Sequence, residues 1–132
     1  MNSEHLILAK KFNSFAYELV SNEEKVKSDI SLLSDDVLYR RIIFNKYYYA
    51  LYHKYLAYDV NLSINSGRNK HSTILKKLQN CDDKLYLTFS KLQSLRIWAD
   101  YQLEDNPQAI NINLITLNED VWNFIKRKTI NC

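Results

Sequence analysis

Apolar side chains recur every three or four residues in four segments of the chain, which is the spacing of one face of an α-helix. The segments cover about residues 4–20, 34–58, 70–78 and 84–103. In the first of them the apolar positions are Leu6, Leu8, Ala9, Phe12, Phe15, Ala16 and Leu19. Polar side chains fill most of the remaining positions, so each segment is predicted to be an amphipathic helix.

Short polar residues mark where these helices should begin. Ser3 stands before the first segment and is a predicted N-cap, because its hydroxyl can accept a hydrogen bond from an unpaired backbone N–H group of the first turn. Ser34 or Asp35 should cap the second helix in the same way, and Asp82 or Asp83 the fourth. The acidic side chains also suit the positive end of the helix dipole.

The last part of the chain has a mixed pattern. Pro107 fits the first turn of a final helix. The sequence "AININL" at residues 109–114 alternates like a strand, whereas the residues after it keep helical spacing. A lone strand would have no partner in this chain, so a helix is the favoured interpretation. The polar stretch 21–33 is predicted to be a connection that can include a partial helical turn, and the stretch 61–69 is predicted to break the helical pattern.

The scarcity of turn-forming residues supports a helical fold. Among 132 residues there is one Gly and one Pro, whereas a β-sandwich or barrel needs many tight turns that favour these residues. The predicted fold class is therefore all-α, an antiparallel bundle of four to five helices. A chain of this length corresponds to a single domain, residues 1–132.

Charge and cysteine content narrow the classes of function. The formal net charge is +3, from 18 Lys plus Arg and 15 Asp plus Glu, which is too slight an excess to indicate nucleic-acid binding by itself. Cys81 and Cys132 fit no metal-ligand spacing and no disulfide framework. We therefore expect no metal, no cofactor and a reducing, cytoplasmic location. No signal peptide is recognisable, and no apolar run is long enough to span a membrane.

Three motifs contain most of the side chains that could contact a ligand. The first is the run Tyr48, Tyr49, Ala50, Leu51, Tyr52 and His53. The second is the pair Lys70 and His71, and the third is formed by Leu92, Leu95, Arg96, Ala99, Asp100 and Tyr101. In order and rough spacing, over about residues 35–125, these motifs resemble the HEPN superfamily of small helical-bundle proteins. One departure is Lys46, which stands seven positions before His53 where many relatives have Arg.

The motif with which HEPN ribonucleases cut RNA, Arg-x(4–6)-His on one late helix, is absent. In that motif the His can take the 2′-hydroxyl proton, and the Arg can stabilise the charge that develops on phosphorus. Here Tyr101 stands five positions after Arg96, and no histidine follows. A composite site remains as an alternative, with His53 as base and Arg96 as phosphate clamp. It would make the protein a metal-independent endoribonuclease.

Each candidate residue also has a structural interpretation. Lys46, Tyr49 and His53 lie one turn apart and form one stripe; they could contact phosphate or a base, or His53 could be a core histidine, which is the favoured interpretation. Arg96 and Asp100 are spaced for an intrahelical ion pair. The two interpretations of Arg96 are balanced, whereas Asp100 is favoured as the anchor of a histidine or tyrosine. The remaining candidate binding residues are His71 and Tyr101.

The resemblance, together with the absence of the nuclease motif, favours a binding protein over an enzyme. It implies a homodimer, and often a nucleotidyltransferase partner, in toxin–antitoxin or phage-defence systems. Tyr101 would then be the candidate acceptor of a nucleotidyl group, because its phenol could take one up. The ligand would be RNA or a nucleotide. Ten tyrosines also suggest that some lie in the core and others at an interface, with stacking on RNA bases as a second choice. A third alternative is a structural helical module of a larger complex.

Overall fold

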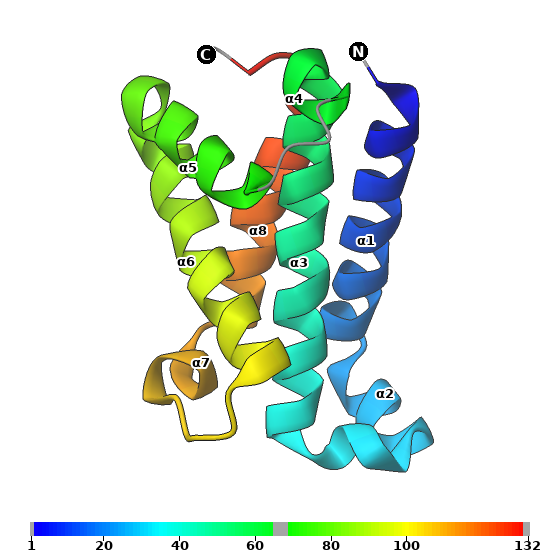
Figure 1. The fold of residues 1–132 in the computed structure, drawn as a ribbon. Coiled ribbons are helices and arrows are strands. Elements are labelled where there is room, and N and C mark those ends of the chain that lie inside the picture. The colour runs from blue at the N-terminus through cyan, green and yellow to red at the C-terminus, as the bar shows by residue number, and fades with distance from the viewer. Residues whose placement is uncertain (1, 65–68, 131–132) are drawn as a thin grey trace.

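The computed structural model describes residues 2–64 and 69–130, and most of these residues are helical (Figure 1). The elements in chain order are α1 Ser3–Ser21, α2 Glu23–Asp29, the 3-10 helix η1 Ser31–Ser34, α3 Asp36–Tyr58, α4 Val60–Ile64, α5 Lys70–Cys81, α6 Asp83–Tyr101, α7 Pro107–Asn111 and α8 Leu114–Ile125. Within the described ranges there is no strand. The predicted all-α fold class is therefore confirmed.

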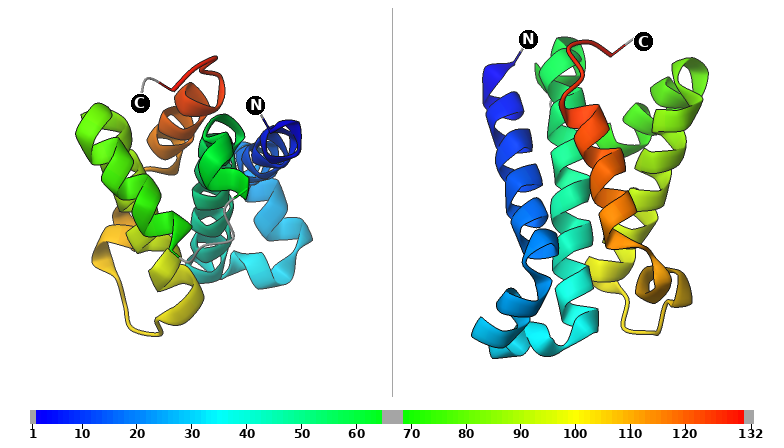
Figure 2. Two further views of the ribbon diagram at one scale, coloured as in Figure 1. Left: turned by 45° about the horizontal axis from the view of Figure 1, so that its top comes forward. Right: turned by 180° about the vertical axis from the view of Figure 1, so that it is seen from behind.

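Four long helices form the bundle. Along the chain α1, α3, α6 and α8 alternate in direction, so that each runs antiparallel to the next (Figures 1 and 2). The helix α3 is central, because α1, α6 and α8 all pack against it. The helix α5, which like α8 has 12 residues, packs against α6 and lies near the end of the bundle at which the described chain begins and finishes (Figure 1).

Two of the predicted caps are confirmed and one is wrong. The Asp35 carboxylate accepts from two N–H groups in the first turn of α3, at 3.0 and 3.2 Å. Asp82 caps α6 by accepting from the Leu85 N–H at 3.0 Å. At α1 the cap is Asn2, whose Oδ1 accepts from two first-turn N–H groups at 3.1 and 3.3 Å. Ser3, the predicted cap, is instead the first residue of that helix.

The expected connections and the single final helix need correction. The stretch 21–33 contains α2 and part of η1. The stretch 61–69 begins inside α4, and its residues 65–68 lie outside the described residues. After Pro107 there are two helices, because the chain turns extended at Ile112 and Asn113. The Asn113 side chain accepts from two N–H groups of α8 at 3.0 and 3.1 Å. The strand-like alternation there thus reflects a buried isoleucine followed by a helix cap.

Two of the three consecutive tyrosines belong to the core. Tyr47 and Tyr48 are fully buried, whereas Tyr49 is half-buried. Each buried hydroxyl has a partner: Tyr47 is hydrogen-bonded to Asn118, and Tyr48 to His71. A tyrosine can be buried in this way because its hydroxyl keeps a hydrogen bond that it would otherwise make to water. Less of the aromatic content is therefore left over for an interface than the sequence suggested.

Three basic side chains on α3 serve the packing of the bundle. Arg40 donates to backbone carbonyl groups of Ala109 and Ile112 at 3.1 and 2.8 Å. Arg41 lies over the Trp98 ring, 4.0 Å from its centre, and donates to the Trp98 carbonyl at 2.7 Å. Lys54, although charged, is 2 % exposed. These residues hold the ends of other helices against α3 and are not available as a solvent-facing basic stripe.

The remaining expectations concern the cysteines, membrane spans and metal binding. Cys81 is not a free thiol in the structure, so the expectation that it is a lone thiol is wrong; Cys132 lies outside the described residues. Among the helices described, none has both the length and the apolar character needed to cross a membrane. The described part of the chain also contains no group of three or more His, Cys, Asp or Glu side chains arranged to hold a metal ion.

Candidate functional site

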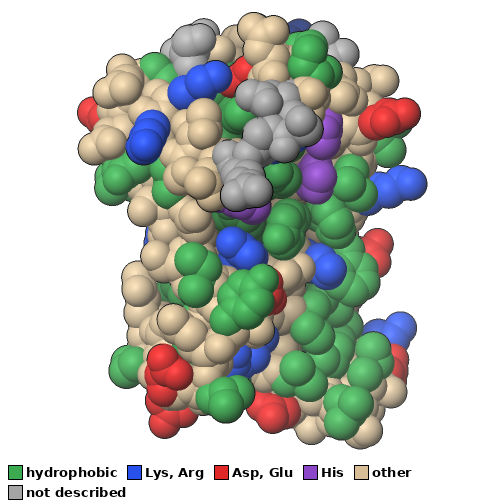
Figure 3. Space-filling model, viewed as in Figure 1, with side chains coloured by type: hydrophobic (Ala, Val, Ile, Leu, Met, Phe, Trp, Pro, Cys, Tyr) green, Lys and Arg blue, Asp and Glu red, His purple; other side chains and the backbone are tan. Residues whose placement is uncertain are grey.

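All three histidines of the chain come together near one end of the bundle, although they lie on α1, α3 and α5. His5 and His53 face each other with 2.8 Å between their Nδ1 atoms and stacked rings. The Tyr52 ring lies between His53 and His71, with centroid distances of 5.1 and 4.5 Å. Figure 3 shows histidine side chains reaching the surface on this face. The helix crossings thus join three segments that are distant in sequence.

A second group of contacts connects the histidines to α6. The guanidinium carbon of Arg96 lies 4.9 Å from the centre of the Tyr48 ring and 5.7 Å from that of Tyr49. Tyr48 in turn is hydrogen-bonded to Nδ1 of His71. Burial raises the pKa of the Tyr48 hydroxyl, although the charge of Arg96 acts in the opposite direction. Tyr48 therefore stays protonated at neutral pH between a cation and an imidazole.

Tyr49 is the side chain that contacts most of this group. Its ring lies 6.2 Å from the His53 ring, 6.3 Å from the His71 ring and 6.3 Å from the Phe12 ring. We call the whole assembly the histidine–aromatic cluster; its members are His5, Phe12, Tyr48, Tyr49, Tyr52, His53, His71 and Arg96. Most members are half-buried, so they combine fixed positions with faces that a ligand can reach.

Burial keeps the histidines of the cluster neutral. It is the largest cause that lowers the pKa of His53 to about 4, and the nearby His5 and His71 lower it further. Burial also lowers the pKa of His71, with Arg96 adding to the effect. At His5 burial and Lys70 lower the pKa against the opposing charge of Glu4. At pH 7 the three rings can therefore each donate and accept one hydrogen bond.

Arg96 carries the positive charge of the cluster and is incompletely satisfied. Its side chain is 10 % exposed, and its only ion pair among the described residues is a 3.9 Å contact with Asp100. Asp100 also accepts from the Asn45 amide at 3.1 Å. The buried Nε of Arg96 has no hydrogen-bond partner within the described part of the chain. A buried donor without a partner costs about 1–3 kcal/mol, so Nε is held at a cost to stability, and the 10 % of the side chain that is exposed is the part that a ligand can contact.

Most of the predicted site residues meet here. Tyr49, His53, His71 and Arg96 are members of the cluster, and Lys46 lies at its edge with Nζ 5.2 Å from the Phe12 ring centre. Tyr49 contacts both His53 and Arg96, so the two predicted catalytic residues are connected through its ring.

Two other predicted residues take different positions. Asp100 contacts Asn45 and Arg96, so the expectation that it anchors a histidine or tyrosine is not met among the described contacts. Tyr101 is 74 % exposed at the end of α6, and none of the ring contacts found among the described residues involves it.

Sequence reasoning missed His5 and Phe12 on α1 and the position of Tyr52. His5 and Phe12 are seven residues apart, which is two helical turns, so both lie on the face of α1 that packs against α3. A histidine on the apolar stripe of the first helix was the available signal. The register with which α1 packs against α3 cannot be predicted from the sequence.

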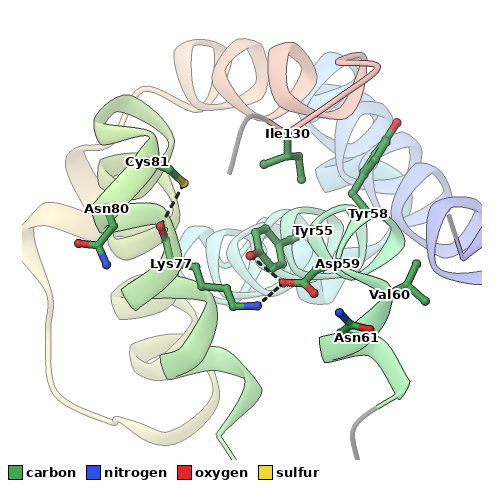
Figure 4. A pocket seen from close by; sticks show the side chains of 9 residues that line it. All are labelled: Tyr55, Tyr58, Asp59, Val60, Asn61, Lys77, Asn80, Cys81 and Ile130. Atoms are coloured by element: carbon green, nitrogen blue, oxygen red, sulfur yellow. Dashed lines mark hydrogen bonds and ion pairs between the residues drawn. The ribbon is translucent and has the colours of Figure 1, made fainter.

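A separate pocket of about 620 Å³ lies between α3, α4 and α5, and its charged groups already have partners (Figure 4). Asp59 accepts from Lys77 at 2.6 Å and from the Tyr55 hydroxyl at 3.0 Å. Burial raises the pKa of Asp59, but these hydrogen bonds and one from the Leu62 N–H outweigh it, so that the pKa is lowered. This carboxylate therefore stabilises the helix junction, and the histidine–aromatic cluster remains the better candidate site.

Comparison of the chain with family models, with curated proteins and with solved structures finds no match.

Proposed function

We propose that the protein is a HEPN-like binding protein that contacts single-stranded RNA through the histidine–aromatic cluster. The family part of this proposal rests on the three motifs of the sequence. The binding part rests on what those motifs form when the chain folds. Stacking of a base on an aromatic side chain contributes about 1–3 kcal/mol, and the half-buried ring of Tyr49 offers such a face.

The observation that carries the proposal is the state of Arg96. Its guanidinium is held over two tyrosine rings with one donor unpaired and with a distant carboxylate as its ion-pair partner. A phosphate group could pair with the exposed part of this side chain, because guanidinium pairs well with phosphate oxygens. Neutral histidines beside it can hydrogen-bond to a base or a ribose without adding charge. Together these groups match one nucleotide unit of a single strand.

Fluorescence anisotropy with a labelled single-stranded RNA tests the proposal. Arg96→Gln removes the charge from the cluster and should weaken binding about tenfold or more, since a charged hydrogen bond contributes about 1.5–3 kcal/mol. Lys91→Ala removes a positive charge from an exposed position on the same helix and should change affinity little. A melting curve for each variant separates lost binding from lost folding. Equal affinities for Arg96→Gln, Lys91→Ala and the unchanged protein would refute RNA binding at this cluster.

RNA cleavage by a composite site is the second candidate function, favoured by the shared contact of His53 and Arg96 with Tyr49. The pKa of His53, about 4, speaks against it, because a general base works best when its pKa is near the operating pH. The same RNA, analysed on a denaturing gel after incubation with the protein, distinguishes the two. If the unchanged protein cleaves the RNA and both His53→Ala and Arg96→Gln abolish the cleavage, the function is catalysis and not binding.

A nucleotidyltransferase partner in a toxin–antitoxin or phage-defence system stays part of the proposal. Tyr101 is the proposed acceptor: its phenol oxygen would attack the α-phosphorus of a nucleoside triphosphate, with pyrophosphate as the leaving group and its own proton released to solvent. The 74 % exposure of Tyr101 supports access by such a partner. Intact-mass measurement of protein from its native cells should show one added nucleotidyl group, absent in Tyr101→Phe. Masses that differ only by the one oxygen atom that the substitution removes would refute this modification.

A further inference from the structure

Two pockets adjoin each other where α1 packs against α8, and their volumes are about 770 and 480 Å³. Asn13, Ser14 and Trp122 line both of them, so the two pockets form one continuous groove. Figure 2 shows α1 and α8 side by side when the molecule is seen from behind. We call this feature the α1–α8 groove. None of the described residues that line it is a member of the histidine–aromatic cluster.

The α1–α8 groove is long enough for a short stretch of extended polypeptide. On α8 its lining begins at Ile115 and continues to Lys126. With a rise of about 1.5 Å per residue, this part of the chain is about 16 Å long. An extended chain advances about 3.3 Å per residue, so about five residues of such a chain can lie along the groove. Each pocket alone already has the volume of about 300–1,000 Å³ that is usual for a small-molecule site, so the whole groove suits a longer ligand.

The two ends of the groove differ in charge and polarity. At the end formed by the smaller pocket, three cations have no ion pair among the described residues: Lys10, Lys126 and Lys128. No Asp or Glu is among the described residues that line this end. At the other end the larger pocket presents mainly apolar surface and the carboxylate of Glu119. The groove is therefore basic at one end and mainly apolar at the other.

The positive charge is more than an effect of the end of α8. Cations that follow α8 suit the negative end of its dipole, but Lys10 lies within α1. Lys54 of α3 also lines the basic end; it is 2 % exposed and donates to the Arg127 carbonyl at 2.6 Å. Burial and the charge of Lys10 lower the pKa of Lys54, so the cations of this end repel one another. A carboxylate between them would offset that repulsion.

Asn13 supplies a polar group in the middle of the groove. The residue is 5 % exposed, and its Oδ1 has no hydrogen-bond partner within the described residues. The terminal torsion of an asparagine side chain has a broad range, so a small rotation can bring Oδ1 to a donor that lies in the groove. Every peptide unit except that of proline carries an N–H donor. A polypeptide in the groove can thus give this atom the partner that it lacks.

A peptide fits this combination of groups better than a nucleic-acid strand does. A strand carries a phosphate at each nucleotide, and the carboxylate of Glu119 would repel phosphates at the apolar end. Apolar side chains can instead pack on Ile115 and Trp122, which are 67 and 49 % exposed. We propose that the α1–α8 groove binds an extended segment of a partner protein, with acidic residues at the basic end and apolar residues at Trp122 and Ile115. This proposal does not rest on RNA binding at the cluster, and either can fail without the other.

Panning of a phage-displayed peptide library against the full chain tests the proposal. The library contains linear peptides about seven residues long, so that each can extend beyond the groove at its ends. We expect the selected peptides to share a block of Asp or Glu next to large apolar residues. A fluorescein-labelled peptide of the shared sequence should bind one-to-one in fluorescence anisotropy, and added salt should weaken the binding because it screens the carboxylate–lysine contacts. The absence of a shared sequence, or a shared basic sequence, would overturn the proposal.

Matched variants test whether the peptide lies in the groove. Lys10→Glu/Lys128→Glu reverses two charges of the basic end and should weaken the binding of the labelled peptide at least about tenfold. Lys11→Glu/Lys91→Glu makes the same change in net charge at exposed positions outside the groove and should change the affinity less than about twofold. Ser14→Trp places a large side chain at an exposed position in the middle of the groove and should block binding. Equal affinities for the two double variants would contradict the proposal; a melting curve for each variant checks the fold.

The two Trp residues allow an independent check of the site. Trp98 is buried with its indole N–H donated to the Glu104 carbonyl, whereas Trp122 is exposed. The selected peptide should shift the NMR indole signal of Trp122 and leave that of Trp98 and the histidine signals in place. A peptide that shifts the histidine signals instead would bind at the cluster and contradict the assignment. A single-stranded RNA that displaces the labelled peptide as well as the unlabelled peptide does would assign the groove to nucleic acid and overturn the proposal.

Discussion

The guanidinium of Arg96 lies 4.9 Å from the centre of the Tyr48 ring, and the Tyr48 hydroxyl is hydrogen-bonded to His71 on a different helix. One fully buried tyrosine therefore connects α6 to α5 through α3. This arrangement positions Arg96 and His71 relative to each other, and both were candidates from the sequence.

Tyr48→Phe removes the hydroxyl and keeps the ring under Arg96. It should lower the free energy of unfolding by about 1–3 kcal/mol, because His71 loses its partner in a half-buried position. Urea unfolding followed by circular dichroism measures the loss. Tyr101→Phe is the matched control, since Tyr101 is 74 % exposed and its change should cost almost nothing. A Tyr48→Phe protein as stable as the control would contradict the importance of this hydrogen bond.

The lowered pKa values of the histidines predict how the free energy of unfolding depends on pH. The pKa of His53 is about 4 in the folded protein, against an ordinary value of 6.5. Between these values the unfolded chain binds a proton that the folded chain does not, so the free energy of unfolding rises with pH there. The contribution of His53 to the free energy of unfolding should be complete above pH 6.5. It should fall as the pH is lowered toward 4 and level off below that pH. The lowered pKa values of His5 and His71 add in the same direction.

His53→Gln tests this dependence, because it removes the titrating ring and keeps a polar side chain. Urea unfolding of both proteins at a series of pH values from 4 to 7 gives the two slopes. The variant should show the smaller slope through this window, with the acidic side chains of the two proteins titrating alike. Parallel slopes would mean that His53 is not held neutral by burial.

Helix capping gives a prediction that is independent of the site. Asp35→Ala leaves two N–H groups at the start of α3 without their acceptor. It should lower the free energy of unfolding by about 0.5–2 kcal/mol. Asp105→Ala, at an exposed position between α6 and α7, removes the same charge without a cap. A denaturation experiment that finds equal losses for the two would show that charge, not capping, stabilises this end.

The proposed homodimer also has a specific test. Ile7, Phe15 and Tyr17 on α1 are 54, 48 and 52 % exposed, and we propose this helix as the dimer surface. Sedimentation equilibrium at micromolar concentration should report about twice the monomer mass of 15.7 kDa. Phe15→Lys should shift the equilibrium to the monomer, because a charge would be buried in the interface. A monomer for the unchanged protein would refute the dimer.

The sequence predicted the helices well because they depend on local patterns. Asp35 and Asp82 are caps as expected, since a cap and its helix are neighbours in the chain. The prediction of a single helix in the last segment was wrong, because the role of Asn113 as a cap depends on where the chain turns. Tertiary packing decides that position. The site was partly predictable: Lys46, Tyr49 and His53 share a helical stripe. The approach of His5 to His53, 48 residues away, depends on how α1 packs on α3, and no spacing in the sequence encodes it.

If the three motifs form one RNA-binding cluster, the imidazole groups of the histidines report most directly on the binding of RNA there. The chain has three histidines, and all three lie in the cluster. NMR spectra of the imidazole signals, recorded on untagged protein during titration with a short single-stranded RNA, report on this site alone. We predict that the signals of His53 and His71 shift together and saturably, and that Arg96→Gln abolishes the shift while Lys91→Ala does not. RNA binding seen by anisotropy with all three histidine signals unmoved would contradict the claim.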